Sequence, residues 1–196
     1  MRMNPLKNRP RLPVTLLVLV IVVLMVQNFF LVTKTSEQRE TIDQLNQQID
    51  HFTQVKAGDS ISSFIALNLD SSLAFIEPGM DSKRVLLLVF TTWCNACEQN
   101  MGQWNLLVNE LSQQDVHILG LSPDSLYKIR DYSRRVSVSF PVYSVVNDFS
   151  VMKKHKLLSF PKTLLIDNMG VVLRVWSGIL DDEKRQDITT AVKRRL

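Results

Sequence analysis

Hydrophobic and charged positions divide the first third of the chain into three segments. Residues 1–11 are basic, residues 12–32 contain no charged side chain, and residues 33–56 are polar. The middle segment includes an unbroken apolar run from Leu16 to Val26. A helix over residues 12–32 would be about 32 Å long, which is enough to cross the hydrocarbon core of a bilayer. This pattern predicts a transmembrane signal anchor over residues 12–32, with the lipid bilayer as its partner.

A cleaved signal peptide is the alternative interpretation of this segment. Its apolar core would be shorter, and small residues would follow it at a cleavage site. The chain has no such A-x-A pattern around Val26–Val32, which favours an uncleaved anchor. The positive flank at residues 1–11 predicts an N-terminus in the cytoplasm. We therefore expect a single-pass protein of the inner (cytoplasmic) membrane whose larger part is extracytoplasmic, in the periplasm of a Gram-negative cell.

The excess positive charge of the chain comes from this flank. The net charge is +4, and four basic residues precede residue 12 without any acidic one: Arg2, Lys7, Arg9 and Arg11. Since the chain has 23 basic and 19 acidic residues, residues 12–196 hold 19 of each. The high isoelectric point is therefore a signal of membrane topology, and we expect no nucleic-acid partner.

The polar segment at residues 33–56 is predicted to be a helical spacer. Within residues 37–54, apolar positions follow one another at intervals of three and four residues: Ile42, Leu45, Ile49 and Phe52. This stripe is shorter than two heptads, whereas a coiled coil needs more. A stalk, or a helix leaning on the following domain, is favoured over dimerisation through residues 37–54. Ala57-Gly58-Asp59 marks the predicted start of a domain at residues 57–196.

Apolar runs alternate with amphipathic ones throughout this domain, which is long enough to bury a core. The predicted strands cover residues 64–69, 74–76, 85–91, 116–122, 142–145, 163–167 and 171–176. The predicted helices cover residues 94–111, 124–135, 150–156 and 181–195. The last two strands are joined by the turn Asn168-Met169-Gly170 and form a hairpin. The alternation predicts an α/β domain with a mixed central sheet flanked by helices.

The two cysteines of the chain lie in Trp93-Cys94-Asn95-Ala96-Cys97, between a predicted buried strand and a predicted helix. Free N–H groups and the positive end of the helix dipole favour a thiolate at Cys94. Cys97 lies one turn further on the same face, where it can attack a mixed disulfide formed at Cys94. We therefore predict Cys94 as the nucleophile and Cys97 as the resolving thiol. The Cys94–Cys97 disulfide would be redox-active, and no other cofactor or metal is expected.

Two structural interpretations of the cysteines are less favoured. A zinc site needs four ligands, but the three histidines, His51, His117 and His155, are scattered along the chain. A structural disulfide across so short a loop would remove little chain entropy. An exported domain with one such pair is therefore not using its cysteines as a disulfide framework.

These residues resemble the thioredoxin superfamily, and more closely the membrane-tethered TlpA/ResA-like thiol-disulfide oxidoreductases. The stretch VLLLVFTTWCNAC at Val85–Cys97 is similar to the strand and cysteine motif of that family. Ser159–Asp167 is similar to the segment that carries its cis-proline, and Ala57–Asp70 to the first segment of its domain. The resemblance covers residues 57–196 and implies a thioredoxin-like fold.

The resemblance also implies how a substrate is bound and how the enzyme is recycled. Pro161 would follow a cis peptide bond and face the cysteine pair, with Phe160 and Pro161 beside the bound substrate chain. Trp93 would border the exposed cysteine. A membrane thiol reductase would supply electrons if the protein acts as a reductant. An ordinary trans proline is the alternative for Pro161.

The chain departs from the family pattern at four positions. Ala96 replaces the usual proline before the second cysteine, and Phe160 replaces a smaller residue. Leu88 and Asn100 stand where many members have a polar or acidic side chain. The obvious internal base for Cys97 is therefore missing, and its proton would be taken by water, by another side chain or by the substrate. The redox potential and the choice of partner are the properties these changes affect most.

The most favoured function is that of a membrane-anchored thiol-disulfide oxidoreductase acting on cysteine pairs of exported proteins, with apocytochrome c as one candidate. Nothing beside the cysteines adds positive charge, which favours a reductant over a strong oxidant. A peroxiredoxin-like peroxidase is one alternative, because Thr91-Thr92-Trp93-Cys94 matches a T-x-x-C signature, although Leu87 replaces its proline. A copper or assembly chaperone is the other, with His155 as the downstream histidine expected near the active face.

Overall fold

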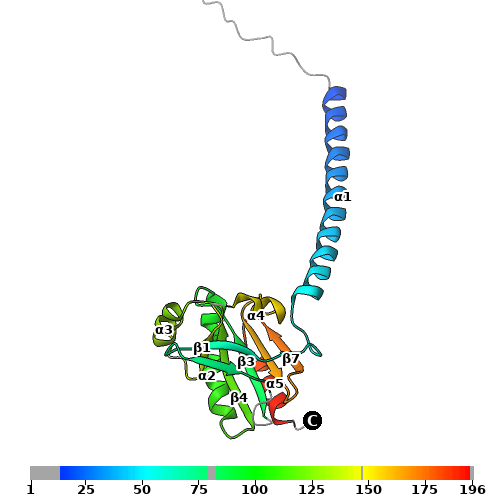
Figure 1. Cartoon of the computed structure of the whole chain (residues 1–196). Helices are drawn as coiled ribbons and strands as arrows, with labels where there is room; N and C mark the ends of the chain where they lie inside the picture. Colours follow the sequence, from blue (N-terminus) through cyan, green and yellow to red (C-terminus); the bar gives the residue numbers. More distant parts are fainter. Residues whose placement is uncertain (1–13, 79–82, 147, 195–196) are drawn as a thin grey trace, which may run out of the picture. The chain divides into compact units, whose positions relative to one another are not determined.

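The computed structural model describes residues 14–78, 83–146 and 148–194, without the side chains of residues 14–15, 37, 40–41 and 43–52. Contacts divide the chain into two units, of which the first ends at His51 and the second begins at Phe52 (Figure 1). The first unit consists of one helix in its described part, and the second is an α/β domain. Each unit is described separately below.

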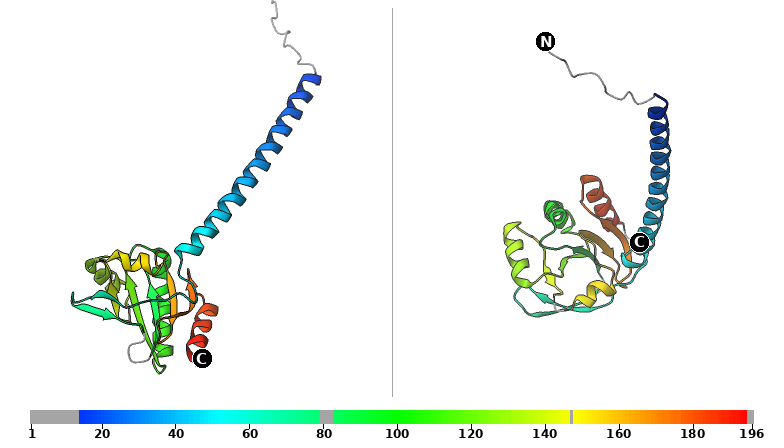
Figure 2. Two further views of the ribbon diagram at one scale, coloured as in Figure 1. Left: turned by 45° about the vertical axis from the view of Figure 1, so that its right-hand side comes forward. Right: turned by 90° about the horizontal axis from the view of Figure 1, so that it is seen from above.

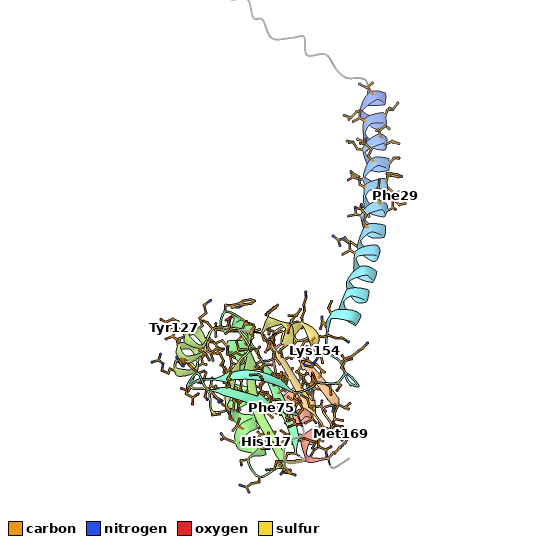
Figure 3. The ribbon with its side chains drawn as sticks, in the orientation of Figure 1. Phe29, Phe75, His117, Tyr127, Lys154 and Met169 are labelled. Carbon is orange, nitrogen blue, oxygen red and sulfur yellow. The ribbon has the colours of Figure 1, made fainter. Side chains whose placement is uncertain are left out.

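Helix α1 runs without interruption over Val14–Thr53. The predicted span and the predicted spacer helix are therefore parts of one helix, because no glycine or proline interrupts residues 14–56. Its segment Leu16–Ser36 is long and apolar enough to cross a membrane. The described apolar side chains of this segment are exposed, as Phe29 illustrates (Figure 3).

Two predictions about the first unit fall outside the described residues. The stripe predicted on residues 37–54 depends on the side chains of Leu45, Ile49 and Phe52, which are not described, whereas Ile42 is exposed. The basic residues of the N-terminal flank also lie outside the described range. Dimerisation through residues 37–54 and the orientation of the helix therefore stay predictions.

The domain is built on a seven-stranded mixed sheet with the order β2-β1-β5-β4-β3-β6-β7. Strands β3, β4 and β5 are parallel, and the remaining neighbours pair antiparallel. The strands are β1 Phe64–Asn68, β2 Leu73–Ile76, β3 Arg84–Val89, β4 Val116–Ser122, β5 Val142–Ser144, β6 Lys162–Ile166 and β7 Val172–Ser177. The mixed sheet and the terminal hairpin agree with the thioredoxin-like fold expected from the sequence.

Four helices cover the two faces of this sheet: α2 Asn95–Leu111, α3 Leu126–Arg135, α4 Phe149–Lys154 and α5 Asp182–Lys193. Helices α2, α3 and α5 lie on one face and α4 on the other (Figure 2). Alternate residues of β3 point into the two cores, with Leu86 and Leu88 on the α2 side and Val85 and Leu87 on the α4 side. Because both faces are covered, the strand is apolar throughout.

A buried hydrogen bond fixes helix α2 against the sheet. The indole Nε1–H of Trp104 donates to Thr163 Oγ1 of β6 at 2.9 Å, and both residues are buried. A buried indole needs such a partner, because an unpaired N–H would cost free energy. This contact holds the helix that begins beside Cys94.

Candidate active site

Strand β3 brings the cysteine motif to the edge of the sheet, and a tight turn then leads into α2. The Phe90 N–H donates to Leu121 O at 3.1 Å, which continues the pairing with β4. The Cys94 N–H then donates to Thr91 O at 3.4 Å and closes the turn. The first cysteine therefore lies beyond the carboxyl end of a parallel strand, where α/β sheets commonly carry their sites.

Cys94 is the N-cap of α2, which begins one residue later than predicted. Its backbone is extended, and its Sγ accepts the Cys97 N–H at 3.2 Å. Its carbonyl oxygen also accepts the Glu98 N–H at 3.1 Å. The sulfur therefore occupies the position at which a helix N-terminus stabilises a negative charge.

The two cysteines differ in exposure. Cys94 is half-buried, whereas Cys97 is completely buried in the core on the α2 side. Burial raises the pKa of the Cys97 thiol far above its usual range, and the neighbouring Cys94 and Asp124 raise it further. Cys97 is therefore a neutral thiol at neutral pH, and Cys94 is the sulfur that a partner can reach.

The peptide bond between Phe160 and Pro161 is cis, as the sequence predicted. Pro161 is buried, and its carbonyl oxygen accepts the Gly178 N–H at 3.0 Å. The ring of Phe160 makes an edge contact with Trp93, with 6.4 Å between the ring centroids. Trp93 is 72% exposed, and both Cys94 and Phe160 pack against the α2-side core. The fold thus brings together the residues predicted to bind substrate.

Asn100 stands where a ResA-type glutamate was expected, and the structure gives it a bracing role. It is buried on α2, and its Nδ2 donates to Gly178 O at 3.0 Å. Its Oδ1 accepts the Leu180 N–H at 2.8 Å. These bonds fix the loop after β7 to the catalytic helix and leave Ile179 47% exposed beside the Pro161 turn. Sequence reasoning missed Ile179, because no motif marks it.

Asp124 places a carboxylate beside the cysteine motif that the motif positions Leu88 and Asn100 do not supply. Leu88 is fully buried among apolar groups, as its sequence context predicts. However, Asp124 Oδ2 accepts the Thr92 N–H at 2.6 Å, from the connection between β4 and α3. Its place just after the predicted strand at residues 116–122 becomes a signal only once the strand order is known, since the ends of parallel neighbours meet at one edge.

His155 is not near the cysteines, contrary to the expectation for a copper-binding histidine. It follows α4, and its ring centroid lies 6.1 Å from that of Phe64, a residue of the α4-side core. Its Nε2 lies 3.5 Å from Ser62 Oγ. Cys97 belongs to the core on the other face of the sheet. Within residues 14–78, 83–146 and 148–194, no three His, Cys, Asp or Glu residues gather as metal ligands.

A thioredoxin-like sheet with a cysteine pair at a helix N-terminus, and with a cis-proline after a phenylalanine that contacts Trp93, defines a thiol-redox class of protein. Comparison with known families narrows this class. Residues 58–175, more than half of the chain, match the AhpC/TSA family. The chain therefore belongs to the AhpC/TSA family, in agreement with the thioredoxin-superfamily resemblance of its motifs.

Individual relatives and solved structures agree with this assignment. The thiol-disulfide oxidoreductase ResA of Halalkalibacterium halodurans is 22% identical over 70% of this chain and 78% of its own length. A Chlorobium tepidum structure described as a thiol:disulfide interchange protein DsbE has a TM-score of 0.61 at 18% identity, over 71% of this chain and 99% of that one. The peroxidoxin BcpB of Mycobacterium tuberculosis gives 0.60 at 17% identity, over 72% of this chain and all of that one. The chain is a thiol-disulfide oxidoreductase close to the ResA type. The likeness to the peroxidoxin concerns the fold only.

Proposed function

We propose that the protein is a membrane-anchored, extracytoplasmic oxidoreductase that exchanges disulfides with cysteine pairs of exported proteins through Cys94 and Cys97. One observation carries this proposal. Cys94 is an accessible N-cap whose sulfur accepts the Cys97 N–H, while Cys97 is completely buried one turn further on. This asymmetry suits one attacking sulfur and one resolving sulfur.

The exchange proceeds in two balanced steps. The thiolate of Cys94 attacks one sulfur of a substrate disulfide, the substrate S–S bond breaks, and the released substrate sulfur takes a proton from solvent. The Cys97 thiol then loses its proton and attacks the Cys94 sulfur of the mixed disulfide, which releases the second substrate thiol. The substrate gains two electrons and two protons, and the enzyme is left with a Cys94–Cys97 disulfide. A membrane thiol reductase would return the two electrons.

Three predicted residues, together with one that the structure adds, would form the substrate-binding rim. Trp93 and Phe160 provide an aromatic edge, and the backbone beside Pro161 would pair with the substrate chain. Ile179 adds an exposed apolar side chain on the loop bonded to Pro161. Such a rim would recognise an unfolded or extended segment around the substrate cysteines, as apocytochrome c would present.

Reduction is the favoured direction of electron flow. A strong oxidant owes its potential to an unusually stable reduced form. Here Asn95 and Ala96 are neutral and Glu98 is acidic, so no residue within or just after the motif adds the positive charge that would stabilise the thiolate of the reduced pair. We therefore propose that the protein donates electrons to its substrates outside the cytoplasm, anchored by Leu16–Ser36.

The decisive experiment measures reduction of insulin disulfides by the reduced full-length protein in detergent micelles. We expect the C94S variant to lose reduction completely, because no accessible sulfur remains. We expect the C97S variant to stop at a stable mixed disulfide with insulin, which a non-reducing gel would detect. In the native cell the same variant should trap its partners as mixed disulfides, which mass spectrometry would identify. A C94S variant as active as the wild type would overturn the proposal.

A thiol peroxidase is the second candidate, because Cys94 is accessible and ends the T-x-x-C run that begins at Thr91. In this function Cys94 would attack the peroxide, and an external thiol would reduce the oxidised Cys94 without Cys97. Peroxide consumption by C97S with an external thiol therefore separates the two functions. Rapid turnover of peroxide by C97S, together with no reduction of insulin by the wild type, would favour the peroxidase. Stoichiometric Cu(I) binding without either activity would favour the chaperone.

A further inference from the structure

A carboxylate lies beside the turn that carries Cys94, although it comes from a distant part of the chain. Asp124 Oδ2 accepts the Thr92 N–H at 2.6 Å. The contact arises because β3 and β4 are parallel neighbours, with Val89 paired to Leu121, so the segments after the two strands meet at one edge of the sheet. A hydrogen bond from a backbone N–H to an ionised carboxylate is among the stronger ones in proteins.

Two buried serines hold Asp124 in this position. Its backbone N–H donates to Ser122 Oγ at 3.2 Å, and its carbonyl oxygen accepts the Ser144 hydroxyl at 2.7 Å. Ser144 Oγ also accepts the Val146 N–H at 3.2 Å. Both serines are at most 1% exposed, and they lie on β4 and β5. Because the backbone of Asp124 is fixed on both sides, its carboxylate has a defined place next to the active-site turn.

Three groups interact electrostatically with Cys97: Cys94 at the N-cap of α2, Tyr132 of α3, and Asp124 in the connection after β4. Glu98 and Arg135 interact in turn with Tyr132. Glu98 is paired with Arg135 at 3.1 Å, and burial raises the pKa of Tyr132 so that it stays neutral. Among the described residues no cation forms an ion pair with Asp124. Its charge therefore acts on Cys97 without a paired counter-charge.

We propose that Asp124 is a positioning residue for the thiol exchange: its carboxylate, on a backbone held by two buried serines, accepts the Thr92 N–H and so fixes the turn that presents Cys94. This inference rests on the proposed function. It gives a role in thiol exchange to the carboxylate of Asp124, whereas the motif positions Leu88 and Asn100 carry no carboxylate. Asp124 acts through the turn and through Cys97, and the proton of Cys97 leaves to solvent.

Ellman's reagent separates the two steps in one experiment on the reduced full-length protein in micelles. Attack of Cys94 on the reagent releases one coloured thiolate, and attack of Cys97 on the mixed disulfide releases a second. The C97S variant, which lacks the second release, assigns the phases. This assay distinguishes failure of the proposed function, in which C94S would still release one thiolate at the rate of the wild-type first phase, from failure of the role of Asp124.

The Asp124→Asn variant removes the charge and keeps an oxygen that can accept the Thr92 N–H. We expect its first phase to be unchanged. Loss of one neighbouring negative charge raises the thiolate fraction of Cys97 by about tenfold. The second phase should then be about threefold faster, because nucleophilicity falls as the thiol becomes more acidic. The Asp124→Ala variant also loses the hydrogen bond, so its first phase should be slower.

The matched control is Asp131→Asn, which removes an exposed acidic charge on α3 and should change neither phase. Across pH 6–8 the second phase should rise about tenfold per pH unit in the wild type, as expected for a thiol far below its pKa. A second phase in Asp124→Asn that is equal to or slower than that of the wild type would overturn the charge effect. A first phase in Asp124→Ala equal to that of the wild type would overturn the positioning role.

Discussion

Asn100 illustrates how a single side chain connects the active-site helix to the loop that faces it. Its amide donates to Gly178 O and accepts the Leu180 N–H, and the residue is 1% exposed. A glutamate at this position could accept from Leu180 but could not donate to Gly178 when ionised. The amide therefore suits a bracing role, and the carboxylate beside the cysteines comes from Asp124.

Replacing Asn100 by alanine leaves the half-buried carbonyl of Gly178 and the buried N–H of Leu180 without partners. We expect the free energy of unfolding to fall by about 2–4 kcal/mol, since each unsatisfied group costs about 1–3 kcal/mol. Urea denaturation of the full-length protein in micelles, followed by tryptophan fluorescence, measures this change. Asn109→Ala is the control, because Asn109 is exposed on the same helix and its loss should cost less than about 0.5 kcal/mol. Equal effects of the two substitutions would contradict the bracing role.

At the level of elements, the patterns that depend on nearby residues could be predicted from the sequence. The apolar run at β3 identifies a strand covered on both faces, and the predicted strand at Val116–Ser122 coincides with β4. The start of α2 follows from the position of Cys94, which the structure shows as the N-cap. These features follow from hydrophobic periodicity and helix capping, which act over a few residues.

Contacts between elements distant in sequence could not be predicted in the same way. The contact of Asp124 with Thr92 depends on the order of β4 and β3 in the sheet and on the buried serines. The position of His155 depends on which face of the sheet α4 covers, which the sequence analysis did not predict. For these two residues the missing information is tertiary. Helix α1 was predicted as two segments because the charge pattern changes at residue 33, although the lack of glycine and proline over residues 14–56 indicates one helix.

Helix α4 carries a titratable group that should make its packing sensitive to acid. Burial lowers the pKa of His155 in the folded protein, and the charge of Lys154 (labelled in Figure 3) lowers it further. The Lys154 ammonium donates to Ser62 Oγ. The unfolded chain therefore binds a proton at His155 below about pH 6.5, where the folded chain does not. Stability is present above this pH and is lost as the pH falls through it.

We expect the free energy of unfolding to be smaller at pH 5.5 than at pH 7.5. The His155→Gln variant should lose most of this difference, because glutamine does not titrate and can still bond Ser62. Urea denaturation at both pH values provides the measurement. His117→Gln, which replaces a half-buried histidine on β4, is the control and should keep the difference. An undiminished pH effect in the His155 variant would show that another group is responsible.

At the level of the whole molecule, the chain joins an apolar helix to a redox domain, and the chemistry depends on which side of the membrane the domain occupies. The apolar segment Leu16–Ser36 predicts a membrane span but not its direction. The direction is predicted by the four basic residues before residue 12. An oxidising compartment would supply substrate disulfides, whereas the cytoplasm would keep most thiols reduced.

Because the chain has only two cysteines, thiol labelling can test this topology directly. We expect a membrane-impermeant maleimide to label the reduced wild-type protein in intact spheroplasts, mainly at Cys94, since Cys97 is buried. The labelled protein should retain its full mass and stay in the membrane fraction after alkaline carbonate extraction, as an uncleaved anchor requires. The control places one cysteine before the helix, as Asn4→Cys in a C94S/C97S background, and should be labelled only after lysis. Labelling of Asn4→Cys in intact spheroplasts, with protection of Cys94, would reverse the orientation and remove the exported proteins as substrates.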